Sequence, residues 1–287
     1  GSKVITFNGE IYNYQTLREE LIAAGHTFTT KSDTEVLLHG YEQWGVDLLQ
    51  RVRGMFTFVI WDKNKQELFG ARDHFGIKPF YYAKMNGTFM YASEIKSLLR
   101  HPDFVKELNA EALKPYMTFQ YPAIGETFFK GVYKLPEGHY FTYRDGKMDI
   151  HRYYDEDFRE GKQKLGELVN SIDQTVCDSV KAHQIADVEV GSFLSSGVDS
   201  SYVAAVARPQ HTYSIGFGKG TYNESQQAGE LAELLKLNNT AESLTDEEAF
   251  AAFPRIQWHL DEPDSNPSCV PLYFLSALAA KDVKVVL

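Results

Sequence analysis

Cysteine is scarce in this sequence, which has 287 residues and only Cys177 and Cys269, with no CxxC spacing. Two such cysteines predict buried thiols in a reducing, cytoplasmic compartment, and neither a disulfide framework nor a zinc site. Long apolar runs are also missing, and none approaches the roughly 18 residues of a membrane span. Gly1-Ser2-Lys3 leads directly into a strand-like segment, so no signal peptide is expected.

Basic residues are in deficit, with 29 Lys and Arg against 39 Asp and Glu, a formal net charge of −10. This balance argues against binding to nucleic acid, which needs a basic surface. The remaining composition, 43% hydrophobic and 24% charged, is that of a globular protein. The length suits two domains of ordinary size.

The first half of the chain has the pattern of a β-rich domain. Turns are expected at Asn8-Gly9, Asn86-Gly87 and Asp145-Gly146, the last two as hairpin turns. Two helices carry possible capping boxes, Thr16 with Glu19 and Ser32 with Glu35. Strands are predicted at 3–7, 55–61, 67–71, 80–84, 88–92 and 139–143, and helices at 16–24, 33–44 and 109–119.

The second half alternates strands and helices, after a polar stretch at 155–163 that is typical of a linker. Helices are predicted at 164–183, 200–207, 224–235 and 272–280, and strands at 188–194, 211–217 and 283–287. Alternation of this kind indicates an α/β domain with a parallel sheet.

A Ser/Gly-rich loop, Ser195-Ser196-Gly197-Val198-Asp199-Ser200, lies between a predicted strand and a predicted helix. Such a loop directs backbone N–H groups and the positive end of the helix dipole at one point, which favours an anion. Asp199 would repel a polyphosphate unless it held a bridging divalent cation, so it suggests Mg²⁺. The alternative is that Ser195 or Asp199 only caps the helix, and the residues alone leave both readings open. The loop is not a Walker A motif, because it lacks that spacing and its lysine.

An SxGxDS sequence after a strand resembles the pyrophosphate (PP) loop of the N-type ATP pyrophosphatases. The resemblance implies ATP binding by Ser195, Ser196, Gly197, Val198, Asp199 and Ser200, with Asp199 as a metal ligand. Ser196 stands where the family usually has Gly. The resemblance also assigns Leu194 and Ile215 to ATP contact, although periodicity alone places both in the core.

A second motif, Asn8-Gly9-Glu10, is followed at a distance by Ser32-Asp33. By local pattern these residues form a turn and a helix start. They nonetheless resemble the glutamine pocket of N-terminal-nucleophile (Ntn) amidotransferases. The resemblance implies that Asn8 and Gly9 face the developing oxyanion and that Glu10 and Asp33 bind the α-ammonium of glutamine. Acidic side chains suit that cationic amine.

A third segment, residues 72–79, also resembles the glutaminase domain. We expect a turn between strands there, with Arg72 and Asp73 as a buried ion pair. His74 stands next to an acid and could serve as a base, but a structural role is favoured.

These motifs, in this order, resemble the glutamine-hydrolysing asparagine synthetases over essentially the whole chain. Asp261-Glu262-Pro263, Pro267-Ser268 and Tyr222-Asn223-Glu224 fit the same pattern without an assignable role. The implied fold class is α/β: a partial αββα glutaminase sandwich at 1–155, a linker at 156–163, and a partial parallel-sheet PP-loop domain at 164–287. The implied reaction is ATP-dependent amidation of aspartate with ammonia from glutamine, which releases AMP and pyrophosphate.

The family's nucleophile is an N-terminal cysteine, and neither Cys177 nor Cys269 can take that part. We therefore expect an internal fragment with no glutaminase activity of its own, with sheet edges that a second copy could cover as a homodimer. Two alternatives stay open. One is a synthetase of the same architecture with another acceptor, such as a β-lactam-forming enzyme, and the other is a non-catalytic nucleotide-binding fragment.

Overall fold

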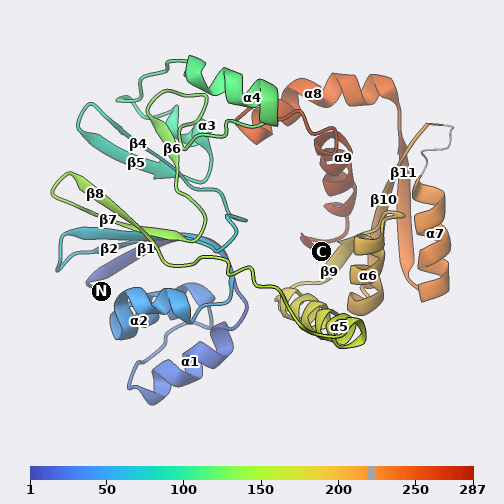
Figure 1. Cartoon of the computed structure of the whole chain (residues 1–287), viewed down its shortest axis with the longest axis horizontal. Helices are drawn as coiled ribbons and strands as arrows, with labels where there is room; N and C mark the ends of the chain where they lie inside the picture. Colours follow the sequence, from blue (N-terminus) through green and yellow to red (C-terminus); the bar gives the residue numbers. More distant parts are fainter. Residues whose placement is uncertain (219–223) are drawn as a thin grey trace. The chain divides into compact units, whose positions relative to one another are not determined.

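The computed structural model describes residues 1–218 and 224–287 (Figure 1). The chain divides into two compact units, Gly1–Arg159 and Glu160–Leu287. Each unit has its own hydrophobic clusters, and each is described by itself.

The first unit is built on two antiparallel sheets. The larger has the strand order β1-β2-β3-β7-β8 and the smaller the order β5-β4-β6. Their strands are β1 Lys3–Ile11, β2 Gly54–Asp62, β3 Glu67–Arg72, β4 Tyr81–Met85, β5 Thr88–Ala92, β6 Val132–Lys134, β7 His139–Arg144 and β8 Lys147–Arg152. The helices are α1 Tyr14–Ala23, α2 Asp33–Trp44, η1 Gly45–Gln50, α3 Ile95–Leu98, η2 Ala110–Ala112 and α4 Leu113–Phe119.

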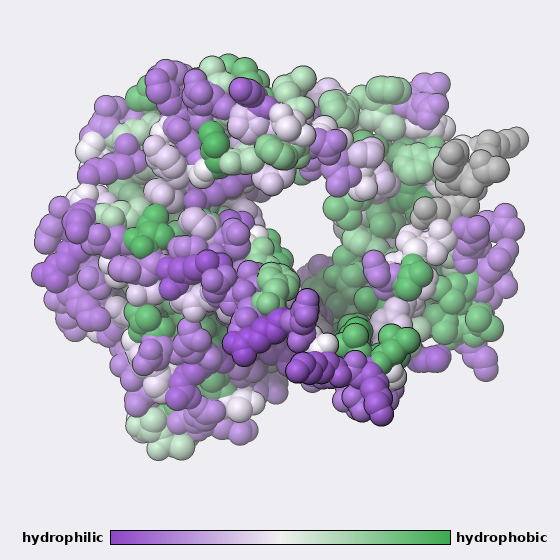
Figure 2. Space-filling view, viewed as in Figure 1, coloured by the Kyte–Doolittle hydropathy of each residue, from purple (hydrophilic) through white to green (hydrophobic). Residues whose placement is uncertain are grey.

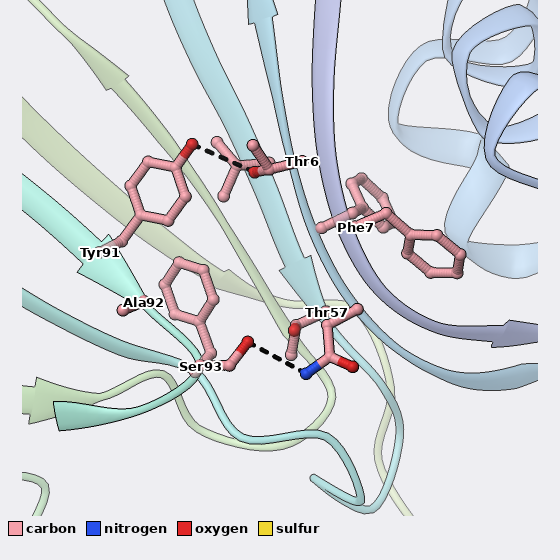
Figure 3. A pocket seen from close by; sticks show the side chains of 10 residues that line it. Thr6, Phe7, Thr57, Tyr91, Ala92 and Ser93 are labelled. Carbon is pink, nitrogen blue, oxygen red and sulfur yellow. Dashed lines mark hydrogen bonds between the residues drawn. The ribbon is translucent and has the colours of Figure 1, made fainter. Parts of the chain in front are cut away.

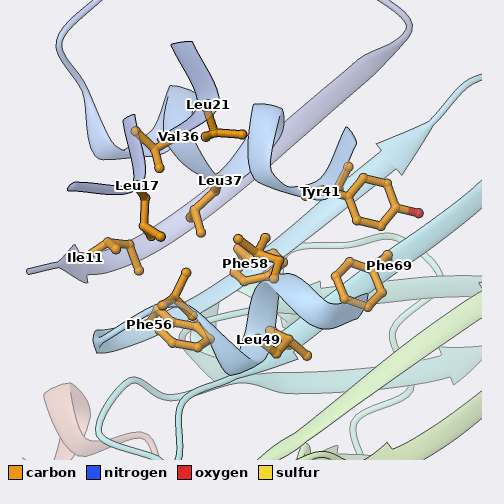
Figure 4. Packing of buried hydrophobic residues seen from close by; sticks show 14 residues of the cluster. Ile11, Leu17, Leu21, Val36, Leu37, Tyr41, Leu49, Phe56, Phe58 and Phe69 are labelled. Atoms are coloured by element: carbon orange, nitrogen blue, oxygen red, sulfur yellow. The ribbon is translucent and has the colours of Figure 1, made fainter. Parts of the chain in front are cut away.

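Three hydrophobic clusters define the layers of this unit. Helices α1 and α2 cover one face of the larger sheet, where Leu37 and Tyr41 pack against Phe58 and Phe69 (Figure 4). A second cluster, around Phe80 and residues of both sheets, fills the space between the sheets. A third packs α3 against the smaller sheet. The predicted αββα sandwich is therefore confirmed.

Strand β1 corrects the turn predicted at Asn8-Gly9. The strand runs through both residues to Ile11, with Asn8 opposite Thr57 and Gly9 opposite Phe56. Gly9 has φ +155°, and a Cβ there would lie 2.1 Å from the Met55 carbonyl oxygen. The glycine therefore permits close approach of two backbones within the sheet.

The two hairpin predictions are confirmed, since Asn86-Gly87 and Asp145-Gly146 join β4 to β5 and β7 to β8 with positive φ. The capping predictions are mixed. Ser32 caps α2 by accepting a hydrogen bond from the Thr34 N–H, but its predicted capping box with Glu35 is wrong, because the Glu35 carboxylate accepts from the Thr29 and Thr30 N–H groups instead. Helix α1 instead begins after Asn13, so the predicted capping box at Thr16 is wrong.

The second unit contains a four-stranded sheet of order β11-β10-β9-β12, and all of its pairings are parallel. Helices α6 and α7 pack on one hydrophobic cluster, around Leu194, and α9 packs on another, around Tyr213. The bounds are α5 Leu165–His183, β9 Val190–Phe193, α6 Val198–Ala207, β10 His211–Phe217, α7 Glu224–Leu235, β11 Asn238–Leu244, α8 Asp246–Leu260, α9 Cys269–Ala279 and β12 Val285–Val286. The predicted parallel α/β sheet is confirmed.

The strand order of this sheet reverses at β9. From β9 the chain moves outward through β10 to β11 and then returns to the other side of β9 as β12. Ligands of open parallel sheets bind at such a reversal, beyond the carboxyl ends of the strands. The Ser/Gly loop follows β9 directly and therefore lies at this position.

The sequence patterns did not predict α3, η1, β6, β11 and α8. Strand β11 lies at the edge of its sheet, and most of its residues are exposed and polar. None of the helices within the described part of the chain is both long and apolar enough to cross a membrane.

Candidate functional site

A cavity of about 250 Å³ lies in the first unit, lined among others by Thr6, Thr57 and Ser93 (Figure 3). Asn8 also forms part of its wall. Asn8 Nδ2 donates a hydrogen bond to Ser93 Oγ at 3.0 Å. Nearby, the Thr6 and Tyr91 hydroxyl groups are 3.1 Å apart. The lining also includes Phe7, Thr57, Phe58, Val59, Phe80 and Ala92. The Asn8 amide thus lines the cavity, and its hydrogen bond to the Ser93 hydroxyl is one that a ligand could replace.

Glu10 and Asp33 carry the negative charge at the other end of this motif. Asp33 opens α2, and its Oδ2 accepts a hydrogen bond from the Ile11 N–H at 3.1 Å. This bond brings the Asp33 carboxylate next to the residue that follows Glu10 on β1. Burial, followed by the negative charges of Glu10 and Asp73, raises the pKa of Tyr12 to about 12. Asp33 thus contacts the backbone of β1 one residue after Glu10, and the negative charge of Glu10 acts at Tyr12 on the same strand end, which suits a cationic group.

The turn predicted at residues 72–79 is present, but the predicted ion pair between Arg72 and Asp73 is wrong. Asp73 is buried, and its carboxylate accepts hydrogen bonds from the N–H groups of Phe56, Phe75, Ile77 and Lys78. Arg72 instead donates to the carbonyl oxygens of Lys78, Leu135 and Gly76 at 2.7–2.8 Å. The Asp73 carboxylate and the Arg72 guanidinium each hold backbone groups in place, because residues of a loop have no neighbouring strand to bond their N–H and C=O groups.

His74 has the surroundings of a packing residue. Its ring stacks on Tyr154 with centroids 4.0 Å apart, and Tyr153 lies 5.5 Å away. Burial lowers the pKa of His74, although the charges of Asp73 and Glu156 oppose that shift. The contacts support the structural role that the sequence favoured.

The Ser/Gly loop occupies the connection between β9 and α6. The Ser195 and Ser200 hydroxyl groups are 2.8 Å apart, and Ser200 Oγ also accepts from the Ser195 N–H at 3.2 Å. Ser195 Oγ accepts from the Gly197 N–H at 3.1 Å. These bonds fix the loop in a tight arch above the first turn of α6.

The loop leaves the first turn of α6 open to solvent. Gly197 is the N-cap, and Val198 is 84% exposed. The first N–H groups of a helix lack intrahelical acceptors and carry the positive end of its dipole. Asp199 stands in this turn with an exposed side chain, so a cation bound there could bridge to an anion. Ser196 has no positive φ, so the serine fits where the PP-loop family usually has glycine.

Leu194 and Ile215 are core residues in the structure. Leu194 is 2% exposed and packs under α6 and α7, while Ile215 packs partly buried near Tyr213. The Ser214 hydroxyl donates to the Leu194 carbonyl oxygen at 2.8 Å. The carboxyl ends of β9 and β10 are thereby held together beside the loop.

The other synthetase-like segments have less definite surroundings. Asp261 ends α8 with φ +64°, and Glu262 is buried. Residues 222 and 223 lie outside the described residues, and Glu224 is described only as the first residue of α7. Pro267-Ser268 precedes α9.

The two units match different protein families. Residues 1–154 match the family described as "Glutamine amidotransferase domain", and residues 171–287 match "Asparagine synthase". The chain is 43% identical to the glutamine-hydrolysing asparagine synthetase 1 of Bacillus subtilis, over 99% of this chain and 45% of that protein. A putative enzyme of the same name from Mycobacterium bovis is 40% identical, over 99% of this chain and 46% of that protein.

A more distant relative is a putative glutamine-hydrolysing asparagine synthetase of Methanocaldococcus jannaschii, which is 32% identical over 99% of this chain and 56% of that protein. The chain thus spans about half the length of the curated relatives that it matches. The amidotransferase match covers more than half of the chain, and the asparagine synthase match follows it in the same order as the two structural units. The chain belongs to the glutamine-hydrolysing asparagine synthetase family.

Proposed function

We propose that the protein amidates aspartate to asparagine with ammonia from glutamine, at the expense of ATP, and releases AMP and pyrophosphate. Residues 1–155 supply a glutamine amidotransferase domain, 156–163 a linker, and 164–287 the ATP-binding part of a synthetase domain. The observation that carries the proposal is the position of the Ser/Gly loop. It lies at the strand-order reversal of a parallel sheet, within the segment that matches asparagine synthase.

In the first domain, the proposed glutamine pocket uses Asn8, Gly9, Glu10 and Asp33. The Asn8 amide faces the cavity and would donate to the oxyanion that forms as the glutamine amide is attacked. The close pairing of Gly9 with β2 fixes the backbone beside it. Glu10 and Asp33 would bind the α-ammonium group of glutamine, as the negative potential at this end of β1 supports.

Glutamine hydrolysis by this family type needs a cysteine nucleophile. Both thiols of the sequence, Cys177 and Cys269, lie in the second unit and are free and half-buried. We therefore propose that the 287-residue chain alone does not hydrolyse glutamine. Free thiols also agree with a cytoplasmic location. The edge strands β1 and β8 are the surfaces that a second copy would cover in a homodimer.

In the second domain, residues 194–200 and Ile215 form the proposed ATP site. The N–H groups of the loop and of the first turn of α6 would hold the phosphates, and Ser195 and Ser200 keep the arch in shape. Asp199 fits an Mg²⁺ ligand, because its carboxylate is exposed beside those N–H groups. When bound, Mg²⁺ would neutralise the phosphate charge that Asp199 would otherwise repel.

Calorimetric titration of the 287-residue chain with ATP tests the second site, with and without Mg²⁺. We expect ATP to bind only with Mg²⁺, and Asp199→Asn to weaken that binding at least tenfold. Asp246→Asn is the matched control, because Asp246 also lies in the first turn of a helix of this unit. Equal loss in both variants, or Mg²⁺-independent binding that Asp199→Asn leaves unchanged, would contradict the assignment.

A further inference from the structure

Two histidines and a glutamate form a compact group near the start of the chain, remote in sequence from the Ser/Gly loop. His26 lies in the α1–α2 connection, and His39 and Glu42 lie on α2. One ligand atom from each residue lies within 4.8 Å of the other two. Within residues 1–218 and 224–287 this is the one group of three such side chains that could hold a metal ion.

The partners of the two imidazoles leave one nitrogen of each directed at the other. His26 Nε2 lies 2.9 Å from the Gln43 amide oxygen, so that nitrogen carries the proton and Nδ1 is left with its lone pair. His39 has a carboxylate oxygen near each ring nitrogen, with Glu35 Oε1 3.7 Å from Nε2 and Glu42 Oε2 3.5 Å from Nδ1. The His26 and His39 Nδ1 atoms are 3.2 Å apart. The His26 Nδ1 lone pair therefore faces His39 Nδ1, either across a hydrogen bond from a proton on His39 Nδ1 or across a bound cation.

A metal ion in place of that proton would bind both nitrogens together with the nearby Glu42 carboxylate. Backing of an imidazole N–H by a carboxylate or amide oxygen is the arrangement that orients metal-bound histidines. Glu35 lies behind His39, and its carboxylate is held by hydrogen bonds from the backbone N–H and hydroxyl groups of Thr29 and Thr30.

Glu42 supplies the third ligand atom, a carboxylate oxygen. Its Oε1 pairs with Lys3 Nζ at 3.0 Å, which leaves Oε2 turned to His39 Nδ1 at 3.5 Å. Ligand atoms about 2.0–2.1 Å from a tetrahedral Zn²⁺ ion are about 3.3 Å apart. The 3.2 Å and 3.5 Å separations match that value.

The geometry points to a divalent transition-metal site, of the kind that binds Zn²⁺, formed by His26 Nδ1, His39 Nδ1 and Glu42 Oε2. Two imidazoles and a carboxylate are ligands that Zn²⁺ prefers, and a water molecule would complete four-coordination. Glu42 is exposed, so the ion can enter from solvent. The site shares no residue with the proposed glutamine pocket or with the Ser/Gly loop.

Metal binding here would stabilise the α1–α2 connection, which leads into Asp33. His26 begins that connection, whereas Thr29 and Thr30 further along it are held by Glu35, the residue behind His39. Ser32 and Asp33 follow and open α2. The ion would therefore join both ends of the connection and fix the position of the Asp33 carboxylate.

The test is calorimetric titration of the chelator-treated 287-residue chain with Zn²⁺ alone. We expect saturable binding that His26→Ala and Glu42→Gln each weaken at least tenfold. Gln43→Ala removes no ligand atom, and the loss of its support for His26 is expected to weaken binding about tenfold. His101→Ala is the matched control, since His101 also lies beside a carboxylate, with 3.9 Å between its Nδ1 and Asp103 Oδ2, but has no second histidine.

Unchanged Zn²⁺ affinity in both His26→Ala and Glu42→Gln would overturn the assignment, and would point instead to the thiols. Absence of Zn²⁺ binding by the unsubstituted chain would overturn it as well, and the group would then be a hydrogen-bonded cluster only. Co²⁺ absorption of the unsubstituted chain gives a readout that needs no variant to fold. Intense tetrahedral bands support the site, whereas the weak spectrum of a six-coordinate ion contradicts it.

Discussion

Replacement of Asp73 by alanine is expected to destabilise the first unit severely. Asp73 is 1% exposed, and its carboxylate accepts four backbone N–H groups at 2.9–3.2 Å. These groups belong to β2 and to the loop that leads from β3 to β4. Asp73→Ala removes the two acceptor oxygens of all four hydrogen bonds at once and leaves no side chain of similar shape.

The size of this loss of unfolding free energy depends on which of the four N–H groups water can reach after the substitution. Phe75 and Ile77 are exposed, so their N–H groups can be hydrated after the substitution. Phe56 is buried and Lys78 is half-buried, so their N–H groups lose an acceptor without replacement. Each such loss costs about 1–3 kcal/mol. For these two groups together we therefore expect about 2–6 kcal/mol of lost unfolding free energy, which is a large share of a domain's stability.

Urea denaturation followed by tryptophan fluorescence measures this loss. Trp44 and Trp61 lie in the first unit, so a Trp258→Phe background makes the signal specific to that unit. Asp149→Ala is the control, because Asp149 is exposed enough for its pairing with Lys147 to contribute little. A loss below about 1 kcal/mol for Asp73→Ala would show that water replaces all four hydrogen bonds, and would refute the reasoning.

Three further predictions concern Glu35, Gly9 and Ser200. The Glu35 carboxylate has a folded-state pKa of about 2, below its ordinary value of 4.5. It therefore stabilises the fold above about pH 4.5, and this contribution disappears as the pH falls toward 2. Glu35→Gln should therefore be less stable than the unsubstituted chain at pH 7 and equal to it near pH 2 in urea denaturation; a difference that persists at pH 2 would contradict this. Gly9→Ala should lower the free energy of unfolding by more than about 2 kcal/mol, because its Cβ would lie 2.1 Å from the Met55 carbonyl oxygen. Gly125→Ala, where a Cβ meets no atom within 4 Å, should change it by less than about 0.5 kcal/mol. Equal losses in the same assay would refute the idea that Gly9 allows close approach of the two backbones. Ser200→Ala removes the hydroxyl that bonds Ser195 and should weaken ATP binding about tenfold in calorimetry without a change in fold; full retained affinity would show that the arch does not depend on it.

Local signals in the sequence were enough to predict most elements of the fold. The hairpins at Asn86-Gly87 and Asp145-Gly146 follow from turn chemistry, because both central residues take positive φ. Strand β10 and helix α7 have the predicted bounds, since the hydrophobic pattern of each changes where the element ends.

Asn8-Gly9 shows where a local signal misleads. The pair has the composition of a turn, but pairing with β2 extends strand β1 through both residues. The glycine instead allows the backbones of β1 and β2 to approach closely. Sequence alone does not distinguish these uses of glycine, because the neighbour that comes close, Met55, is far away in the chain.

Two missed elements differ in what could have found them. Helix α8 begins with a complete capping box, Thr245 with Glu248, which is a usable sequence signal. Strand β11 has no apolar alternation, because it lies at an exposed edge and is held by its backbone pairing with β10. Its position depends on tertiary context.

The candidate sites also differ in whether a local sequence signal could have identified them. The Ser/Gly loop could be identified from the sequence, since its strand–loop–helix context is local. The Arg72–Asp73 pair could not, because the acceptors of Arg72 include the Leu135 carbonyl oxygen, 63 residues away. The His26–His39–Glu42 group was also missed, since His26 and His39 are 13 residues apart with no standard metal-ligand spacing.

The central claim is that the Ser/Gly loop serves a synthetase that activates aspartate. ATP–pyrophosphate exchange tests it directly, in a protein that carries these residues and spans the full length of its relatives. We predict exchange that requires aspartate and that falls at least tenfold in Asp199→Asn. Exchange that ignores aspartate and needs a different carboxylate would contradict the claim.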